Sequence, residues 1–142
     1  METTLDNQTA AFVAPKARGR AANVALWSLQ ILLAAAFVFG GVNKLFGLQQ
    51  EMVDNFAKLA GPWFRYLVGV LELTGAIALV VPRLSGLGAL WLAGVMAGAV
   101  VTHLTVQPPW YFASVPAVLC VVFLLVARAH LAQTKALLGL QK

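Results

Sequence analysis

Charge and cysteine are both scarce in this chain. Of its 142 residues only 11% are Asp, Glu, Lys or Arg, whereas 61% are hydrophobic. An ordinary soluble domain is about 25% charged, and a chain this short cannot bury so much apolar surface in a water-soluble core. Its single cysteine, Cys120, excludes an internal disulfide and a Cys-x-x-Cys redox pair. The composition therefore indicates a membrane protein.

The patterns of several soluble enzymes are also missing from the sequence. It has no Gly-rich phosphate loop, nucleophile elbow or pair of haem-binding histidines, and its His, Glu and Cys residues are too dispersed for a recognisable metal site. The net charge of +5 comes from basic residues scattered at predicted helix ends, which argues against a nucleic-acid partner. We expect neither a metal site nor catalysis by this chain alone, although it could form part of an oxidoreductase complex.

Four apolar stretches dominate the sequence. Each approaches the roughly 20 helical residues that span a hydrocarbon core about 30 Å thick, and none alternates as a membrane strand does. We predict an all-α fold, an integral membrane four-helix bundle of residues 21–128 between a flexible N-terminal tail of residues 1–20 and a C-terminal tail of residues 129–142. The predicted spans are residues 21–42, 63–81, 84–106 and 110–127.

The longest predicted connection joins the first two spans. Between Gly47 and Gly61, apolar residues recur at helical spacing and polar residues separate them. This pattern predicts a short amphipathic helix that lies on the membrane surface or caps the bundle. Its apolar side is formed by Met52, Val53, Phe56 and Leu59.

The basic residues predict how the chain is oriented in the membrane. Seven of the ten Lys and Arg residues precede the first span, follow the last span or occupy the turn between the second and third spans. Under the positive-inside rule, this asymmetry places both tails in the cytoplasm.

Glu72 is the only acidic residue in the apolar bulk of the chain. A charged side chain at the centre of a membrane helix costs about 2.5–3.5 kcal/mol on insertion scales, so such residues usually face a bundle interior or a wet cavity and carry a function. Glu72 lies ten residues from both Pro62 and Pro82, which places it near the middle of the second span. Helical spacing puts Arg65 on the same face.

Further polar residues are predicted near the outer end of the bundle. Asn43 and Lys44 close the first span, and His103 lies about one turn inside the outer end of the third. We predict an outward-facing polar pocket that serves as a quinone or proton site. Glu72 is there either a protonated acid or one partner of an ion pair that fixes helix register. The candidate residues are Asn43, Lys44, Arg65, Glu72 and His103. His130, beyond the last span, is expected to be solvated.

Glycines at helical spacing are candidates for close helix packing. Gly69 and Gly75 lie on the second span with Glu72, and the third span carries Gly94-x-x-x-Gly98. Small residues at such spacing let membrane helices approach one another. We expect Gly94 and Gly98 to pack inside the bundle rather than in a dimer.

Three short motifs resemble those of a known family. They are residues 39–45 (FGGVNKL) ending the first span, residues 69–76 (GVLELTGA) in the second and residues 101–103 (VTH) closing the third. On these residues the chain resembles the DoxX-like family of small four-helix bacterial membrane proteins, over about residues 22–128. The resemblance implies the bacterial cytoplasmic (inner) membrane. It also implies a link to thiosulfate:quinone oxidoreductase, to thiol and oxidative-stress systems or to the maturation of redox enzymes.

Three functions are compatible with these observations. The leading hypothesis is an accessory or membrane-anchoring subunit of a quinone-linked redox system, with a quinone as the candidate cofactor. Its partners would be the lipid bilayer and other membrane or redox proteins. The absence of paired cysteines argues against direct thiol exchange. The alternatives are a small proton-coupled transporter that works as a homodimer and a structural assembly subunit of a membrane complex.

Overall fold

The computed structural model describes residues 18–107 and 109–140 of the chain. These residues form helices and turns and no strand, and four helical segments are long and apolar enough to cross a membrane. The predicted all-α membrane bundle is thereby confirmed. Most of the predicted N-terminal tail lies outside the described residues. The helices are α2 (Arg20–Phe46), α3 (Gln50–Leu59), α4 (Pro62–Val80), α5 (Ser85–Thr105), the 3-10 helix η1 (Trp110–Ala113), α6 (Ser114–Ala129) and α7 (Leu131–Leu137).

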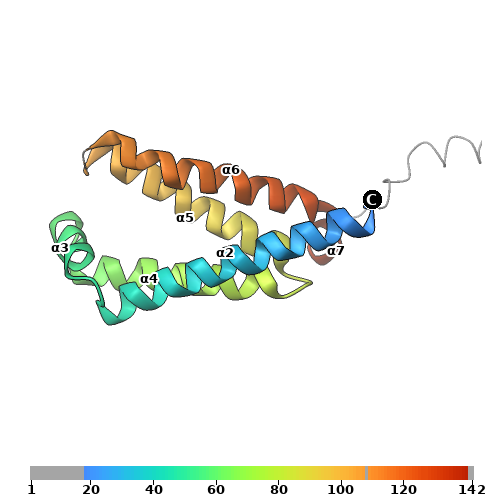
Figure 1. Cartoon of the computed structure of the whole chain (residues 1–142), viewed down its shortest axis with the longest axis horizontal. Coiled ribbons are helices and arrows are strands. Elements are labelled where there is room, and N and C mark those ends of the chain that lie inside the picture. The colour runs from blue at the N-terminus through green and yellow to red at the C-terminus, as the bar shows by residue number, and fades with distance from the viewer. Residues whose placement is uncertain (1–17, 108, 141–142) are drawn as a thin grey trace, which may run out of the picture.

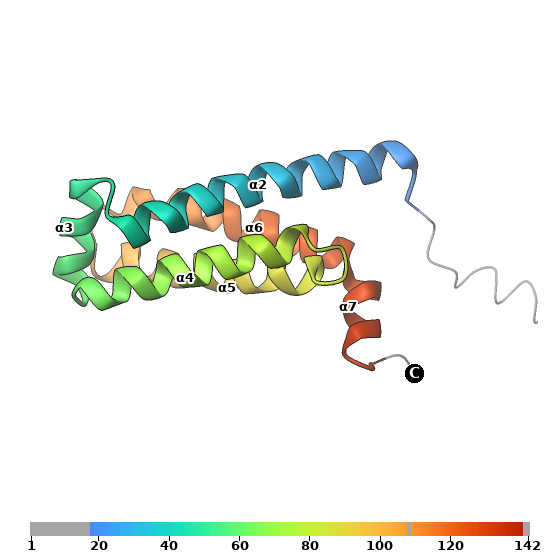
Figure 2. The same ribbon diagram turned by 90° about the horizontal axis from the view of Figure 1, so that it is seen from below.

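The membrane-spanning helices form two antiparallel hairpins. In one hairpin α2 packs along α4, in the other α5 packs along α6, and contact between α4 and α5 joins them. The two hairpins lie close together near α7 and separate toward α3 (Figure 1). Figure 2 shows α3 lying across the end of the bundle opposite α7. The start of α2 and the whole of α7 therefore share one end of the bundle.

A packed apolar core lies between the two hairpins. Leu79 of α4, Leu92 of α5 and Phe123 of α6 are fully buried. Phe37 of α2 meets Phe123 edge-on, with 5.1 Å between the ring centroids. Many other large apolar side chains point outward, including Ile77, which is 60% exposed. An outward apolar surface of this kind contacts the lipid bilayer.

The first membrane helix is longer than predicted. α2 continues four residues past the predicted end of the span, to Phe46, because Gly47 ends it. Gly47 adopts the left-handed conformation, with φ of 64°, and its N–H donates to the carbonyl oxygen of Asn43 at 2.8 Å, as a C-terminal glycine cap does. Gly41 instead permits close packing, since a Cβ added there would lie 2.9 Å from the carbonyl oxygen of Gly69 on α4.

The short helix α3 has the amphipathic pattern that the sequence predicts. Its four apolar residues are half-buried, whereas the polar residues Asp54, Asn55 and Lys58 are exposed. Phe56 contacts Phe64 at the start of α4, with 5.9 Å between ring centroids. α3 therefore lies across the bundle end with its apolar side inward.

The expectation that His130 is solvated is wrong. The chain bends at His130, between α6 and α7, and this bend turns the imidazole toward α2. His130 is only 8% exposed, and its Nε2 lies 3.0 Å from Oε1 of Gln30. The segment predicted as a C-terminal tail thus contains α7, whose Thr134 is also buried.

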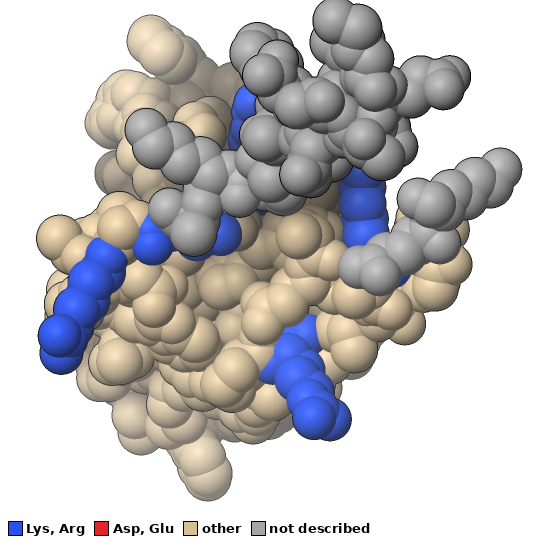
Figure 3. Space-filling model, turned by 90° about the vertical axis from the view of Figure 1, so that its right-hand side faces the viewer, with Lys and Arg blue, Asp and Glu red and all other residues tan. Residues whose placement is uncertain are grey.

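The end of the bundle that holds α7 is basic. Figure 3 looks onto this end and shows Lys and Arg side chains without acidic ones among the residues it describes. These basic side chains are exposed. The described acidic residues instead lie on α3 and in α4. The two ends of the bundle therefore differ in charge.

Candidate functional site

Lys44 and Glu72 form an ion pair between α2 and α4. Nζ of Lys44 lies 2.8 Å from Oε2 of Glu72, and the two side chains are 19% and 7% exposed. Gly40, one turn before Lys44, leaves room for the carboxylate, since a Cβ added there would lie 3.3 Å from Oε2. The pair joins the last turn of α2 to the middle of α4. It also gives the buried carboxylate a charged partner.

Arg65 lies nearby but has another partner. Its Nη1 donates a hydrogen bond to the carbonyl oxygen of Lys44, and its guanidinium lies 4.4 Å from the centre of the Tyr66 ring. A cation on a carbonyl in the last helical turn satisfies an unpaired acceptor and complements the helix dipole. Arg65 is therefore a buried cap for α2, and no ion pair between it and Glu72 occurs in the described structure.

Asn43 is buried beside this cap and does not line the cavity described below. Its backbone carbonyl accepts hydrogen bonds from Gly47 and Leu48. Its side-chain Oδ1 and the Nε of Arg65 are buried and have no hydrogen-bond partner within residues 18–107 and 109–140. Asn43 thus helps to end α2, whereas Lys44 on the next position reaches Glu72.

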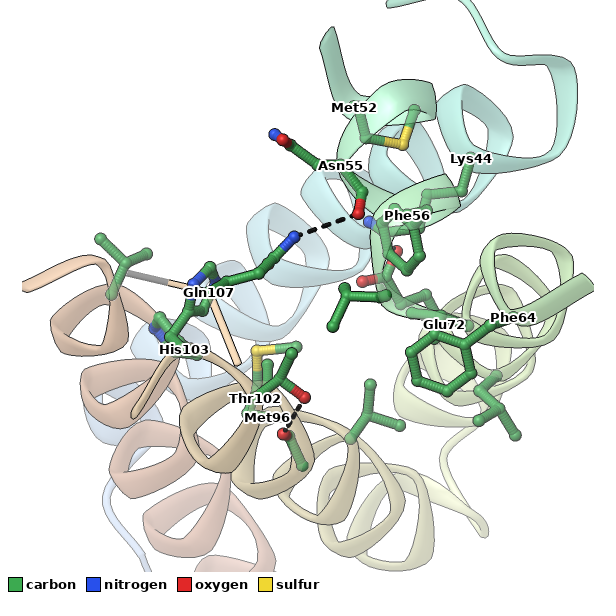
Figure 4. A pocket seen from close by; sticks show the side chains of 18 of the residues that line it. Lys44, Met52, Asn55, Phe56, Phe64, Glu72, Met96, Thr102, His103 and Gln107 are labelled. Carbon is green, nitrogen blue, oxygen red and sulfur yellow. Dashed lines mark hydrogen bonds and ion pairs between the residues drawn. The ribbon is translucent and has the colours of Figure 1, made fainter. Parts of the chain in front are cut away.

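A cavity of about 1100 Å³ opens where the two hairpins separate. It lies among α3, α4, α5 and the start of α6, and Figure 4 shows Lys44 and Glu72 on one side and His103 on another. The aromatic lining residues are Phe56, Phe64 and Trp91, and the other polar ones are Gln49, Gln50, Glu51, Asn55, Thr102 and Gln107. Most binding pockets likewise combine an apolar lining with a few polar groups.

His103 reaches this cavity from the last turn of α5. Its ring lies 6.3 Å from that of Phe112 in η1. Its Nδ1 is buried and has no hydrogen-bond partner among the described side chains and backbone. The structure therefore brings Lys44 and Glu72 into direct contact and places His103 across the same cavity, while Asn43 and Arg65 lie behind it.

The predicted packing glycines fall into two groups. A Cβ added at Gly69 would lie 3.1 Å from the carbonyl oxygen of Gly41, and one added at Gly75 would lie 2.5 Å from Leu92. These two glycines face neighbouring helices. Gly94 and Gly98 instead line the cavity, and a Cβ added at either would have no atom within 4 Å. The expectation that they pack inside this bundle is wrong, because the hairpins separate at their level.

Sequence reasoning missed several residues that shape the cavity. Gln107 donates a hydrogen bond to the carbonyl oxygen of Asn55 at 3.3 Å, which ties the end of α5 to α3. Trp91 donates from Nε1 to the carbonyl oxygen of Leu71 at 2.9 Å. The predicted apolar side of α3 could have indicated that this helix covers the end of the bundle. No sequence pattern shows which helices separate beneath α3.

Metal binding has no candidate cluster in the described part of the chain. No three His, Cys, Asp or Glu side chains come together there. The chemistry open to the cavity is that of an ion pair, the carboxylate of Glu51, an imidazole and a few neutral polar groups. These groups can form hydrogen bonds with a ligand or exchange protons with it.

These features define a small helical membrane protein with a ligand-sized cavity at one end of its bundle. The chain belongs to the DoxX-like family, whose sequence model matches residues 28–126. The matched region includes the cavity residues Lys44, Glu72 and His103, and it ends before His130. No curated protein and no solved structure matches the chain.

Proposed function

We propose that the chain is an accessory subunit of a quinone-linked redox system and that its cavity holds a quinone head group. The observation that carries this proposal is the placement of the Lys44–Glu72 pair and His103 on one ligand-sized cavity. A quinone head group is a flat ring with a hydrogen-bond acceptor at each of two opposite positions. Lys44 and a protonated His103 nitrogen are donors for such acceptors.

The cavity also fits the apolar part of such a ligand. Phe56, Phe64 and Trp91 offer aromatic surface to the ring. Gly94 and Gly98 leave open space along α5, which accommodates the start of an isoprenoid tail. A volume of about 1100 Å³ exceeds what a single head group needs, in keeping with an occupant that carries a tail.

The residues present indicate which steps this chain would carry out and which a partner protein would supply. Electrons for quinone chemistry would come from a partner protein in the same membrane, and this chain would bind and orient the ring. Glu72, as the carboxylate, would hold the ammonium of Lys44 in place against the bound ring. The basic end of the bundle supports a cytoplasmic location for α7 and the start of α2, and so an outward cavity in a bacterial inner membrane. A periplasm-dependent reporter fused after residue 142 should therefore be inactive.

Bound quinone can be measured directly. The full chain, purified in mild detergent from quinone-containing bacterial membranes, should retain close to one quinone per chain after extraction and chromatography. Glu72→Gln should lower the quinone content by roughly tenfold or more, as expected when a hydrogen bond to a charged group is lost. Asp54→Asn is the matched control, since Asp54 is exposed on α3 and does not line the cavity.

Three other results would have distinct meanings. Equal quinone content in Glu72→Gln and wild type would contradict the site. A wild-type homodimer without quinone that releases protons on addition of a lipophilic cation would favour the proton-coupled transporter. A stoichiometric membrane partner, with no quinone and no proton release, would favour the structural assembly subunit, for which the Lys44–Glu72 pair would serve only to fix α2 against α4.

A further inference from the structure

A second cavity, of about 610 Å³, lies at the basic end of the bundle. It lies at the opposite end of the bundle from the cavity next to α3 (Figure 2) and shares no lining residue with it. Two arginines, two neutral polar side chains, a histidine and two apolar rings surround it: Arg18, Arg20, Asn23, Trp27, Pro82, His130 and Gln133. No acidic side chain is found in this lining.

The wall of this cavity is held by a continuous hydrogen-bonded network. The amide nitrogen of Gln30 donates to the carbonyl oxygen of Leu79 at 3.0 Å, so its Oε1 faces Nε2 of His130. That ring nitrogen must therefore carry a proton. Nδ1 of His130 lies 2.9 Å from Oε1 of Gln133. Both imidazole nitrogens thus have protein partners, and the network joins α2, α4 and the α6–α7 corner into a fixed wall.

The arginines, in contrast, have no anionic partner in the described structure. Arg18 and Arg20 are exposed, and neither takes part in a described ion pair. Arg20 begins α2 and Arg18 precedes the N-cap Gly19, which has no side chain to cap the helix. The first turn of α2 contains no acidic residue. The positive end of the helix dipole therefore adds to the two guanidinium charges.

We propose that this cavity binds an anionic phosphate group, carried by a lipid or supplied as free phosphate. Guanidinium forks match phosphate oxygens in pairs, and Asn23 provides a neutral donor beside them. Trp27 and Pro82 line the same cavity with apolar surface, and Trp27 also contacts His130 edge-on, at 6.3 Å between centroids. This apolar surface and the position at a membrane face suit the glycerol part of a lipid, where anionic lipids attract basic residues.

The site can be tested on the full chain in neutral detergent. The probes are phosphatidylglycerol, diacylglycerol with the same acyl chains and inorganic phosphate, and bound ligand is quantified by native mass spectrometry. The double variant Arg18→Gln/Arg20→Gln removes two charges from the cavity. The control Arg83→Gln/Arg128→Gln removes two exposed charges from the same end, and neither residue lines the cavity.

We expect the wild type to bind phosphatidylglycerol well and diacylglycerol weakly. Loss of two charge-assisted contacts should weaken phosphatidylglycerol binding by roughly a hundredfold, whereas the control should change it by less than about threefold. Arginine-dependent binding of inorganic phosphate, with equal binding of the two lipids, would assign the site to free phosphate. Equal losses in both double variants, or no arginine-dependent binding of either phosphate probe, would overturn the proposal. Glu72→Gln should bind phosphatidylglycerol as the wild type does, so the two cavities can be tested separately.

Discussion

Two polar clusters lie between the helices of this protein, and they differ in how completely their hydrogen bonds are satisfied. In the cluster around Gln30 and His130, each described polar group of the two side chains has a protein partner. In the cluster toward α3, buried nitrogen and oxygen atoms of Asn43, Arg65 and His103 lack one within the described chain. Most buried polar groups in proteins are paired, so the exceptions require an explanation.

The surroundings of the two clusters account for the paired amide of Gln30 and the unpaired nitrogen of His103. Gln30 is completely buried where the two hairpins converge, and there an unpaired amide would have neither water nor ligand to bind. The ring of His103 lies where the hairpins separate and a cavity reaches it, whereas Asn43 and Arg65 lie at the end of α2 and outside the cavity lining. A saturated network fixes helix positions, whereas polar groups on a cavity wall remain available to a ligand. We therefore assign Gln30 to structure and the cavity residues to function.

The largest expected effect comes from Glu72→Leu. This change leaves the half-buried ammonium of Lys44 without its partner, and breaking a buried pair typically costs about 3–5 kcal/mol. The free energy of unfolding can be measured by titrating SDS into protein in mild detergent. In the double variant Lys44→Met/Glu72→Leu, apolar side chains replace both charges, and most of the loss should be recovered. Quinone binding should stay absent. Recovery of quinone binding as well would remove the pair from the proposed site.

Gln30→Leu should have the next largest effect. It leaves the Nε2–H of His130 and the carbonyl oxygen of Leu79 without partners, and each buried unsatisfied group costs about 1–3 kcal/mol. The same unfolding titration measures this loss. Gln133→Leu is the control, since Gln133 is exposed and water can replace its contact with Nδ1 of His130. Its expected effect is within about 0.5 kcal/mol. Similar losses in both variants would contradict the structural role of Gln30.

The sequence was sufficient to predict the fold class and the amphipathic α3, because both depend on apolar pattern and length. Glu72 could be singled out because an acid is costly in an apolar helix. The orientation of His130 could not be predicted, since it depends on the bend between α6 and α7. The separation of the hairpins was also not predictable, because it depends on how α4 packs against α5 and on how α3 covers the end of the bundle. For this reason Gly94 and Gly98 were expected in a helix contact and line a cavity instead.

The smallest expected effect on stability distinguishes a glycine that packs against a neighbouring helix, Gly75, from one that lines the cavity, Gly98. Gly75→Ala places a Cβ 2.5 Å from the Leu92 side chain, and such overpacking typically costs about 1–3 kcal/mol. Gly98→Ala meets no atom within 4 Å, so stability should be unchanged or rise by up to about 1 kcal/mol through helix propensity. The SDS titration compares the two variants directly. If Gly98→Ala were as damaging as Gly75→Ala, Gly98 would have to contact a second subunit. The open side of the cavity would then be a homodimer interface, and a ligand would have to enter from another direction.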